Sequence, residues 1–271
     1  QDTPDDIIFD YFQHQAYPDQ PLGRPILGPS TGIKTMRRET LMDFMQTHYH
    51  PKRMVIGAAG NIEHAELVRL VETYFNTTTQ GTFFQAATGQ YQGGTQYIHR
   101  DLEQMHLLLG FPGTSSLAED IYAANIYTTL MGGGMSSRLF QEVREKRGLV
   151  YSIYAFTYPF EDCGLFGIYA GTSVDETLEL FNVVRQELCA SLTTLKDSEI
   201  NRAKQQLKAH ILMSLENTSG RARTLAQNLL THNRPISAQE MIEKIDFVYQ
   251  GNIAIITICN PPVNALSVEV R

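Results

Sequence analysis

The sequence predicts an α+β protein, a two-layer α/β arrangement of two homologous domains of which the first is incomplete. Two observations lead to this fold class. Segments with helical periodicity alternate with short apolar segments that are typical of buried strands. In addition, a shift of about 200 residues superimposes two helix–strand units, whose strands read MVIGAA and IAIITI. The helix residues that coincide are Leu41 with Met241, Met45 with Ile245, and Tyr49 with Tyr249.

The first part of the chain predicts helices, one strand and a long loop. Pro4 can open a helix whose apolar residues, up to Phe12, recur at a spacing of three to four. Prolines and glycines are dense over residues 17–31, which indicates one long ordered loop. Further helices are expected over Thr40–Tyr49 and Glu63–Phe75, and a buried strand over Met54–Ala59.

A polar, uncharged segment at 76–93 has no periodicity, which is typical of a connection between domains. We therefore expect the latter half of an N-terminal domain at 1–78, a linker at 79–94 and a C-terminal domain at 95–271. By the register of the repeat, about 100 residues of the first copy would precede Gln1. The alternative is a chance similarity between two helix–strand pairs.

The C-terminal domain is predicted to combine strands and helices. Segments 150–158 and 164–170 are rich in Tyr, Phe and Ile and predict a hairpin. Two amphipathic helices follow, one marked by Leu178 to Leu188 and one by Ile200 to Leu215, the latter within a helix over 197–229. The remaining expected elements are strands at Thr95–His99, Met105–Phe111 and Asn252–Cys259 and helices at Glu119–Leu130 and Ser137–Glu145.

The composition argues against two kinds of interaction. A net charge of −7 argues against binding to a nucleic-acid backbone, which requires a surplus of Lys and Arg. No run of roughly 18 apolar residues is present, so no membrane span is expected. Cys163, Cys189 and Cys259 are widely spaced, which favours reduced, buried thiols over a disulfide framework or a zinc ribbon.

The glycine-rich stretch GGGMSSRLFQEVREKRGLVY, at 132–151, could suggest a phosphate-binding loop. A P-loop needs Lys followed by Ser or Thr directly after the loop, and Met135 stands there instead. The stretch predicts a helix C-cap and turn, in which glycine tolerates left-handed geometry and Ser136 or Ser137 caps the next helix.

Arg144 and Tyr151 lie seven residues apart, across a helix-to-strand turn at Gly148. A guanidinium and a phenol at the start of a strand can both donate hydrogen bonds to a substrate carbonyl or oxyanion. Local sequence leaves two ordinary roles open as well, a solvated charge for Arg144 and a core aromatic for Tyr151.

The sequence contains no metal motif. His48 and His50 are two residues apart, on or just after a helix, and therefore point in different directions. Neither His-x-x-Glu-His nor its reverse occurs, and there is no G-x-S-x-G for a serine hydrolase. We therefore expect no metal site in this chain alone.

Four stretches taken together carry a resemblance to a known family. They are FDYFQHQAYPDQPLGRPILGP at 9–29, HYHPKRMVIGAAGNI at 48–62, GGGMSSRLFQEVREKRGLVYSIYAF at 132–156 and MSLENTSGRARTLAQNLL at 213–230. The chain resembles the pitrilysin/insulinase-type zinc peptidases, and within them the β subunit of mitochondrial processing peptidase and its bacterial relatives. The resemblance covers nearly the whole chain.

The resemblance implies two processing-peptidase-like domains, each a mostly antiparallel mixed sheet with helices on one face, that close like a clam around an extended peptide. It places the zinc ligands upstream of Gln1, so Zn²⁺ is expected in the intact protein and not in this chain alone. Arg144 and Tyr151 match the family's Arg and Tyr that face the zinc, hold the substrate backbone and stabilise the oxyanion. Glu216 is a further candidate for lining the substrate chamber, although its helix has a simpler role as core.

By this resemblance the chain is part of a zinc-dependent metalloendopeptidase that cleaves extended peptides or presequences. It would supply the C-terminal substrate-binding half and be inactive by itself. Two alternatives stay open, a non-catalytic scaffold subunit of the same fold and a half-enzyme completed by a partner chain. The expected partners are a peptide substrate and a second copy or partner subunit. The expected compartment is the bacterial cytoplasm or, alternatively, the mitochondrial matrix.

Overall fold

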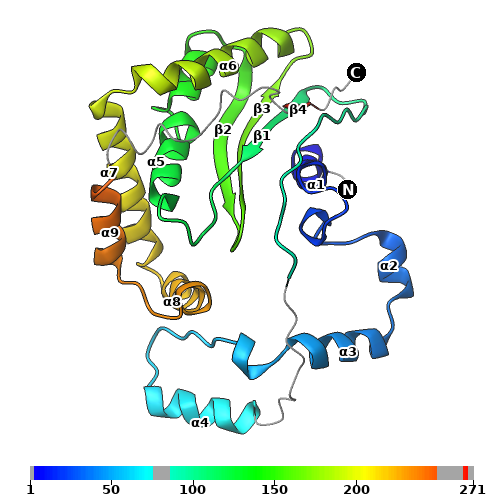
Figure 1. The fold of residues 1–271 in the computed structure, drawn as a ribbon, viewed down its shortest axis with the longest axis vertical. Coiled ribbons are helices and arrows are strands. Elements are labelled where there is room, and N and C mark those ends of the chain that lie inside the picture. Colours follow the sequence, from blue (N-terminus) through cyan, green and yellow to red (C-terminus); the bar gives the residue numbers. More distant parts are fainter. Residues whose placement is uncertain (1–2, 76–85, 249–264, 268–271) are drawn as a thin grey trace. The chain divides into compact units, whose positions relative to one another are not determined.

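The computed structural model describes residues 3–75, 86–248 and 265–267 (Figure 1). The chain forms two compact units. Unit 1 comprises Gln1–Leu27, Thr88–Lys208 and Ile242–Arg271, and unit 2 comprises Gly28–Ala87 and Ala209–Met241. The α+β fold class is confirmed. The predicted domains follow the order of the chain, whereas the units interleave along it, so the predicted boundaries stay a prediction.

An antiparallel sheet organises unit 1. Its strand order is β2-β3-β1-β4, and every described pair of neighbours runs antiparallel. The predicted hairpin is confirmed as β2 and β3, and the predicted strand before it as β1. The bounds are Met105–Pro112 for β1, Val150–Pro159 for β2, Gly164–Thr172 for β3 and Ala265–Ser267 for β4.

Helices cover both faces of this sheet. Helices α5 (Ile121–Gly132) and α6 (Thr177–Thr194) lie on one face, whereas the predicted two-layer arrangement placed helices on one face alone. Tyr127 of α5 packs against Phe166 of β3 at 5.7 Å between ring centroids, and its hydroxyl lies 3.0 Å from Ser191 Oγ of α6. Successive strand residues alternate between faces, and the other set of β1 and β3 side chains contacts helix α1 (Pro4–Ala16).

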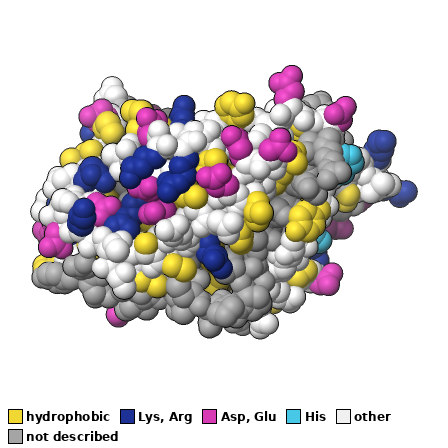
Figure 2. Space-filling model, turned by 90° about the horizontal axis from the view of Figure 1, so that it is seen from above, with side chains coloured by type: hydrophobic (Ala, Val, Ile, Leu, Met, Phe, Trp, Pro, Cys, Tyr) yellow, Lys and Arg dark blue, Asp and Glu magenta, His cyan; other side chains and the backbone are white. Residues whose placement is uncertain are grey.

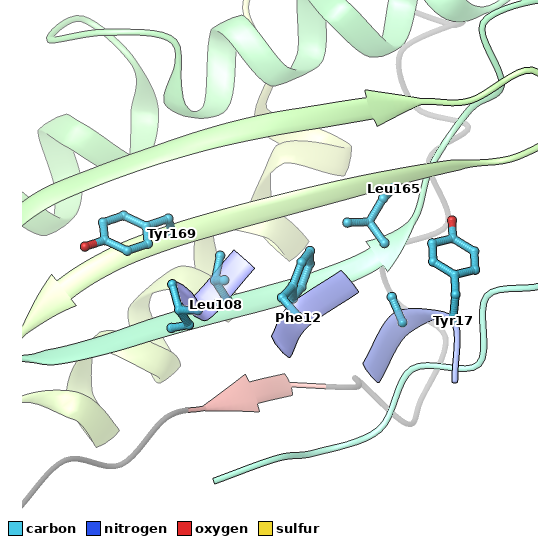
Figure 3. Close-up of a cluster of buried hydrophobic side chains, with 7 residues drawn as sticks. Phe12, Tyr17, Leu108, Leu165 and Tyr169 are labelled. Atoms are coloured by element: carbon cyan, nitrogen blue, oxygen red, sulfur yellow. The ribbon is translucent and has the colours of Figure 1, made fainter. Parts of the chain in front are cut away.

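Helix α1 is held to the sheet by a buried aromatic core (Figure 3). Phe12, 1% exposed, lies among strand residues that include Leu108 and Leu165. Gly110 of β1 makes this approach possible, because a Cβ there would lie 2.5 Å from Phe12 Cε2. The phenol of Tyr17, just beyond α1, donates to the carbonyl of Gly164 at 3.0 Å. The first helix therefore belongs to the core of unit 1.

A buried histidine, His106, is expected to make the stability of unit 1 depend on pH. Nδ1 of His106 lies 2.8 Å from the hydroxyl of Tyr169, and burial lowers the pKa of His106, partly offset by Asp5. The unfolded chain takes up a proton near the ordinary pKa of about 6.5, and the folded protein only at lower pH. The free energy of unfolding should therefore fall as pH drops below about 6.5.

Urea denaturation from pH 7.5 to 5 checks this prediction. A matched series on His106→Gln, which does not titrate, should show a shallower loss; identical slopes would contradict the assignment.

Unit 2 is helical and buries few side chains. The helices that lie wholly within it contain no buried residue. Their bounds are Ser30–Thr35 for α2, Arg38–His48 for α3, His64–Tyr74 for α4 and Thr218–His232 for α8. Helices α7 (Asp197–Ser214) and α9 (Ala238–Asp246) each run from one unit into the other. None of the described helices is long and apolar enough to cross a membrane.

Two predicted strands do not form among the described residues. Met54–Ala59 and Thr95–His99 are free of regular structure. A strand requires a neighbour to share its ladder of hydrogen bonds, and in the described part of the chain neither segment is paired in the sheet. A further predicted strand, Asn252–Cys259, lies outside the described residues and stays a prediction. Apolar patterning thus identified segments able to form strands but could not supply their neighbours.

The predicted helix over 197–229 is two helices. Helix α7 ends at Ser214, and Asn217 caps α8 by accepting a hydrogen bond at Oδ1 from the amide of Gly220 at 2.6 Å. Asn favours this N-cap position because its short side chain reaches the free amides of the first turn. The prediction of buried cysteines is also wrong for Cys189, which is exposed on α6; Cys163 is half-buried.

Candidate functional site

Arg144 lies on a π-helical turn, η3 (Phe140–Glu145). The amide of Lys146 donates at 3.0 Å to the carbonyl of Gln141, five residues earlier, which is the hydrogen bond that widens such a turn. Val143 is completely buried and anchors the turn, while Arg144 next to it is exposed. The predicted helix at 137–145 is therefore present, with a π-helical turn that periodicity does not reveal.

The cations Lys146 and Arg147 next to Arg144 are paired with a carboxylate, and Arg144 is not. Glu142 forms ion pairs with Lys146 and with Arg147, the latter at 3.0 Å. The hydrogen bond from Lys146 lowers the pKa of Glu142, so this carboxylate stays charged. No described carboxylate lies within ion-pair distance of Arg144, whose guanidinium carbon lies 4.8 Å from the ring centroid of Phe140. Arg144 therefore presents a positive charge to solvent.

Tyr151 lies on a β-bulge at the start of β2. Val150 pairs with Thr172 and Ser152 pairs with Gly171, so Tyr151 is an extra residue that has no partner in β3. A bulge redirects the side chain that it carries and is frequent beside functional sites. The side chain of Tyr151 is 72% exposed, which excludes the core-aromatic role that the sequence left open.

A short turn ties these two residues together. The amide of Gly148 donates to the carbonyl of Arg144 at 3.0 Å, and the amide of Leu149 donates to that of Val143 at 3.1 Å. Gly148 has φ +67°, a conformation that favours glycine. Arg144, which lies in this turn, and Tyr151, which lies two residues after it, are called here the Arg–Tyr pair.

The glycines before this turn serve close packing. A Cβ on Gly132 would lie 2.1 Å from the amide nitrogen of Ala155, so α5 approaches β2 closely at this point. Gly133 caps α5 with φ −82°, and the next residue, Gly134, has a positive φ of +157°, the kind of backbone conformation for which a glycine was expected after this helix. The buried hydroxyl of Ser137 has no hydrogen-bond partner, so it does not cap the following helix as predicted.

Glu216 does not lie on a helix. It is exposed in the loop between α7 and α8, and its amide donates to the carbonyl of Met213 at 3.2 Å. It belongs to unit 2, whereas the Arg–Tyr pair belongs to unit 1. The role of Glu216 in lining a chamber stays a prediction.

The described residues do not fit a zinc site. His48 packs against Phe44 with ring centroids 4.4 Å apart and ring planes tilted by 43°, and Nδ1 of His50 accepts a hydrogen bond from the amide of Lys52 at 3.2 Å. Within the described residues, no group of three or more His, Cys, Asp or Glu side chains could hold a metal ion. Zinc ligation needs three or four such groups that converge.

Charges are mixed on the face drawn in Figure 2. Lys and Arg side chains lie there among Asp and Glu side chains and form no continuous basic area. A nucleic-acid backbone is bound by basic residues gathered on one face. This face therefore offers no such surface.

Sequence reasoning missed Phe140 as part of the site. Its spacing of four residues from Arg144 is the signal that could have found it, since residues four apart share one side of a helical turn. It also missed Glu142, whose ion pairs with Lys146 and Arg147 set Arg144 apart from its neighbours.

Known proteins share both the sequence and the fold. Residues 35–207 match the family described as Peptidase M16 inactive domain. An uncharacterized zinc protease of Rickettsia bellii is 37% identical over 246 residues, which cover 90% of this chain and 60% of the relative. An uncharacterized zinc protease of Streptomyces coelicolor is 36% identical over 265 residues, which cover 93% and 57%. The chain thus spans about three fifths of the length of these relatives.

Two solved structures have the same fold. A crystal structure of a peptidase M16 inactive domain from Pseudomonas fluorescens gives a TM-score of 0.86 at 19% identity, covering 99% of this chain and 65% of that one. A chain of Complex III2 from Candida albicans gives 0.84 at 18% identity, covering 93% and 63%. The family match and the identity to the bacterial relatives show that the chain belongs to the M16 peptidases, the pitrilysin-type family that its motifs resemble.

Proposed function

We propose that this chain is the substrate-binding part of a zinc-dependent metalloendopeptidase of the processing-peptidase type, which cleaves extended peptides. The Arg–Tyr pair is the observation that carries the proposal. Arg144 is exposed without a described carboxylate partner, and a bulge turns Tyr151 out of the sheet ladder one turn away. The names of the relatives, uncharacterized zinc proteases, support the reaction class.

The pair has the hydrogen-bond donors that such a role requires. The guanidinium of Arg144 offers five N–H groups and the phenol of Tyr151 offers one O–H. A peptide carbonyl accepts such bonds and accepts them more strongly as negative charge develops on its oxygen. Arg144 and Tyr151 would therefore hold the backbone of the substrate and stabilise the oxyanion.

Unit 2 supports the further proposal that the first domain of this chain is incomplete. Leu41, Phe44 and Met45 form an apolar stripe on α3, and each is about half exposed. By the internal repeat Met45 corresponds to Ile245 of α9, which is completely buried. The same helical pattern thus packs against a core in α9, whereas in α3 it has no core to pack against among the described residues. We place the missing sheet, and with it the zinc ligands, in a part of the intact protein outside residues 1–271.

Two other arrangements would use the same chain. A half-enzyme would receive its zinc ligands from a separate subunit, and the exposed apolar helices of unit 2 favour such a partner over an isolated chain. A scaffold subunit would have no zinc ligands at all. A homodimer and a bacterial cytoplasmic location are compatible with each arrangement and belong to the proposal.

Activity of the intact protein decides among them. We expect the intact protein to contain one zinc ion per chain and to cleave a fluorogenic extended peptide, while residues 1–271 alone cleave nothing. The check combines elemental analysis with peptide hydrolysis on both proteins. An intact protein that neither contains zinc nor hydrolyses the peptide would support the scaffold. Activity that appears only after a zinc-binding partner is mixed with residues 1–271 would support the half-enzyme.

A further inference from the structure

The ring of Phe140 lies beside the guanidinium of Arg144 on the π-helical turn. The guanidinium carbon is 4.8 Å from the ring centroid, within the range of a cation–π contact. Phe140 is half-buried, and its neighbours Leu139 and Val143 are completely buried. The ring therefore stands on a turn that is fixed to the core of unit 1.

This contact differs from the ion pairs around it in what it leaves available. Lys146 and Arg147 donate N–H hydrogen bonds to Glu142, whose single carboxylate offsets part of their positive charge. A ring face attracts a guanidinium through its quadrupole and carries no opposing net charge. The N–H bonds of a guanidinium radiate in its own plane, so a ring beside it need not occupy them. Arg144 is thus held while its charge and its donors stay available.

We propose that Phe140 is a positioning residue that fixes the guanidinium of Arg144 for substrate binding. The inference rests on the proposed function, since it requires that Arg144 contact the substrate. A free arginine side chain samples many rotamers, and every rotamer that misses the substrate carbonyl weakens the contact. The ring of Phe140 restricts the rotamers of Arg144. The turn that carries this ring is itself held in place by the buried side chains of Leu139 and Val143.

A double-mutant cycle in the intact protein tests the pairing. Phe140→Leu keeps an apolar side chain and removes the ring face, and we expect kcat/KM for an extended peptide to fall about 2- to 5-fold. Phe140→Tyr keeps the ring and should retain the original value. In an Arg144→Ala background, Phe140→Leu should change nothing further, because the group that it positions is gone. The loss should appear in the same kinetic parameter, kcat or KM, as that of Arg144→Ala.

A second measurement separates positioning from folding. Phe247→Leu makes the same substitution at a 68% exposed site outside this turn and should leave kcat/KM unchanged. Thermal melts of all variants show whether Phe140→Leu has unfolded the turn; binding of a non-hydrolysable peptide to the still-folded variant should weaken in parallel with kcat/KM. If Phe140→Leu lowers kcat/KM equally with and without Arg144, the positioning role of Phe140 is overturned while the proposed function still stands. No effect of Arg144→Ala would overturn the proposed function instead.

Discussion

Replacing Arg144 by alanine in the intact protein is expected to lower kcat/KM for an extended peptide by about 10²- to 10³-fold, the usual loss for one oxyanion donor. The side chain is exposed and has no described carboxylate partner, so its removal leaves no buried group unsatisfied. The free energy of unfolding should therefore change by less than about 0.5 kcal/mol. Steady-state kinetics and urea denaturation of the same preparation check both values.

The structure offers a matched control three residues away. Arg147 carries the same charge on the same turn, but it is paired with Glu142 at 3.0 Å. Arg147→Ala should leave kcat/KM within about 2-fold, since its guanidinium is engaged in an ion pair with Glu142 and an exposed ion pair contributes little. Tyr151→Phe, which removes only the hydroxyl, should lower kcat/KM, as Arg144→Ala does. Equal losses for Arg144→Ala and Arg147→Ala would show that net charge matters and the Arg–Tyr pair does not.

Replacing Phe12 by alanine is expected to destabilise unit 1 by about 3–5 kcal/mol, the usual range for truncating a core phenylalanine. Phe12 is 1% exposed and lies against Gly110, where a strand residue with a Cβ would collide with its ring. It also packs edge-on against Phe156 at 5.9 Å between centroids. Truncation would leave a cavity between α1 and the sheet that neither side can fill. Chemical denaturation followed by circular dichroism measures the loss.

Phe44→Ala is the comparison for this substitution. Phe44 lies on α3 and is 54% exposed, so its truncation should cost less than about 1 kcal/mol. A small effect at both positions would contradict the packing of α1 on the sheet. Amide exchange within α1 adds a local measure, because Phe12→Ala should release this helix before the strands open.

Local patterns in the sequence predicted most helices and the hairpin, and they failed where a segment depends on distant neighbours. Helix α1 is specified by Pro4 at its start and by an apolar stripe that includes Phe12. The segment Met54–Ala59 has the composition of a buried strand, but a strand exists only when another strand is present to pair with it. The break at Asn217 was missed because apolar spacing continues through it, although Asn is a frequent helix cap.

The candidate site was only partly visible in the sequence. The spacing of Arg144 and Tyr151 pointed to the pair through the family resemblance. The sequence could not show how the pair is held, since a π turn and a β-bulge arise from shifts in hydrogen bonding rather than from residue type. The π-helical turn and the bulge each leave the residue pattern unchanged while altering where a side chain points.

The two backbone irregularities also constrain how this protein can change over evolutionary time. Each one is an extra residue relative to regular structure, one in the turn Phe140–Glu145 and one at Tyr151. Loss of the extra residue from that turn would restore a regular helical turn, and loss of the extra residue at the bulge would restore regular pairing of β2 with β3, so either deletion would abolish the irregularity that redirects a side chain. Point substitutions here can be gradual, whereas insertions and deletions are all-or-none. Descendants that keep the same chemistry should therefore preserve the length of segment 140–152 more strictly than its amino-acid sequence.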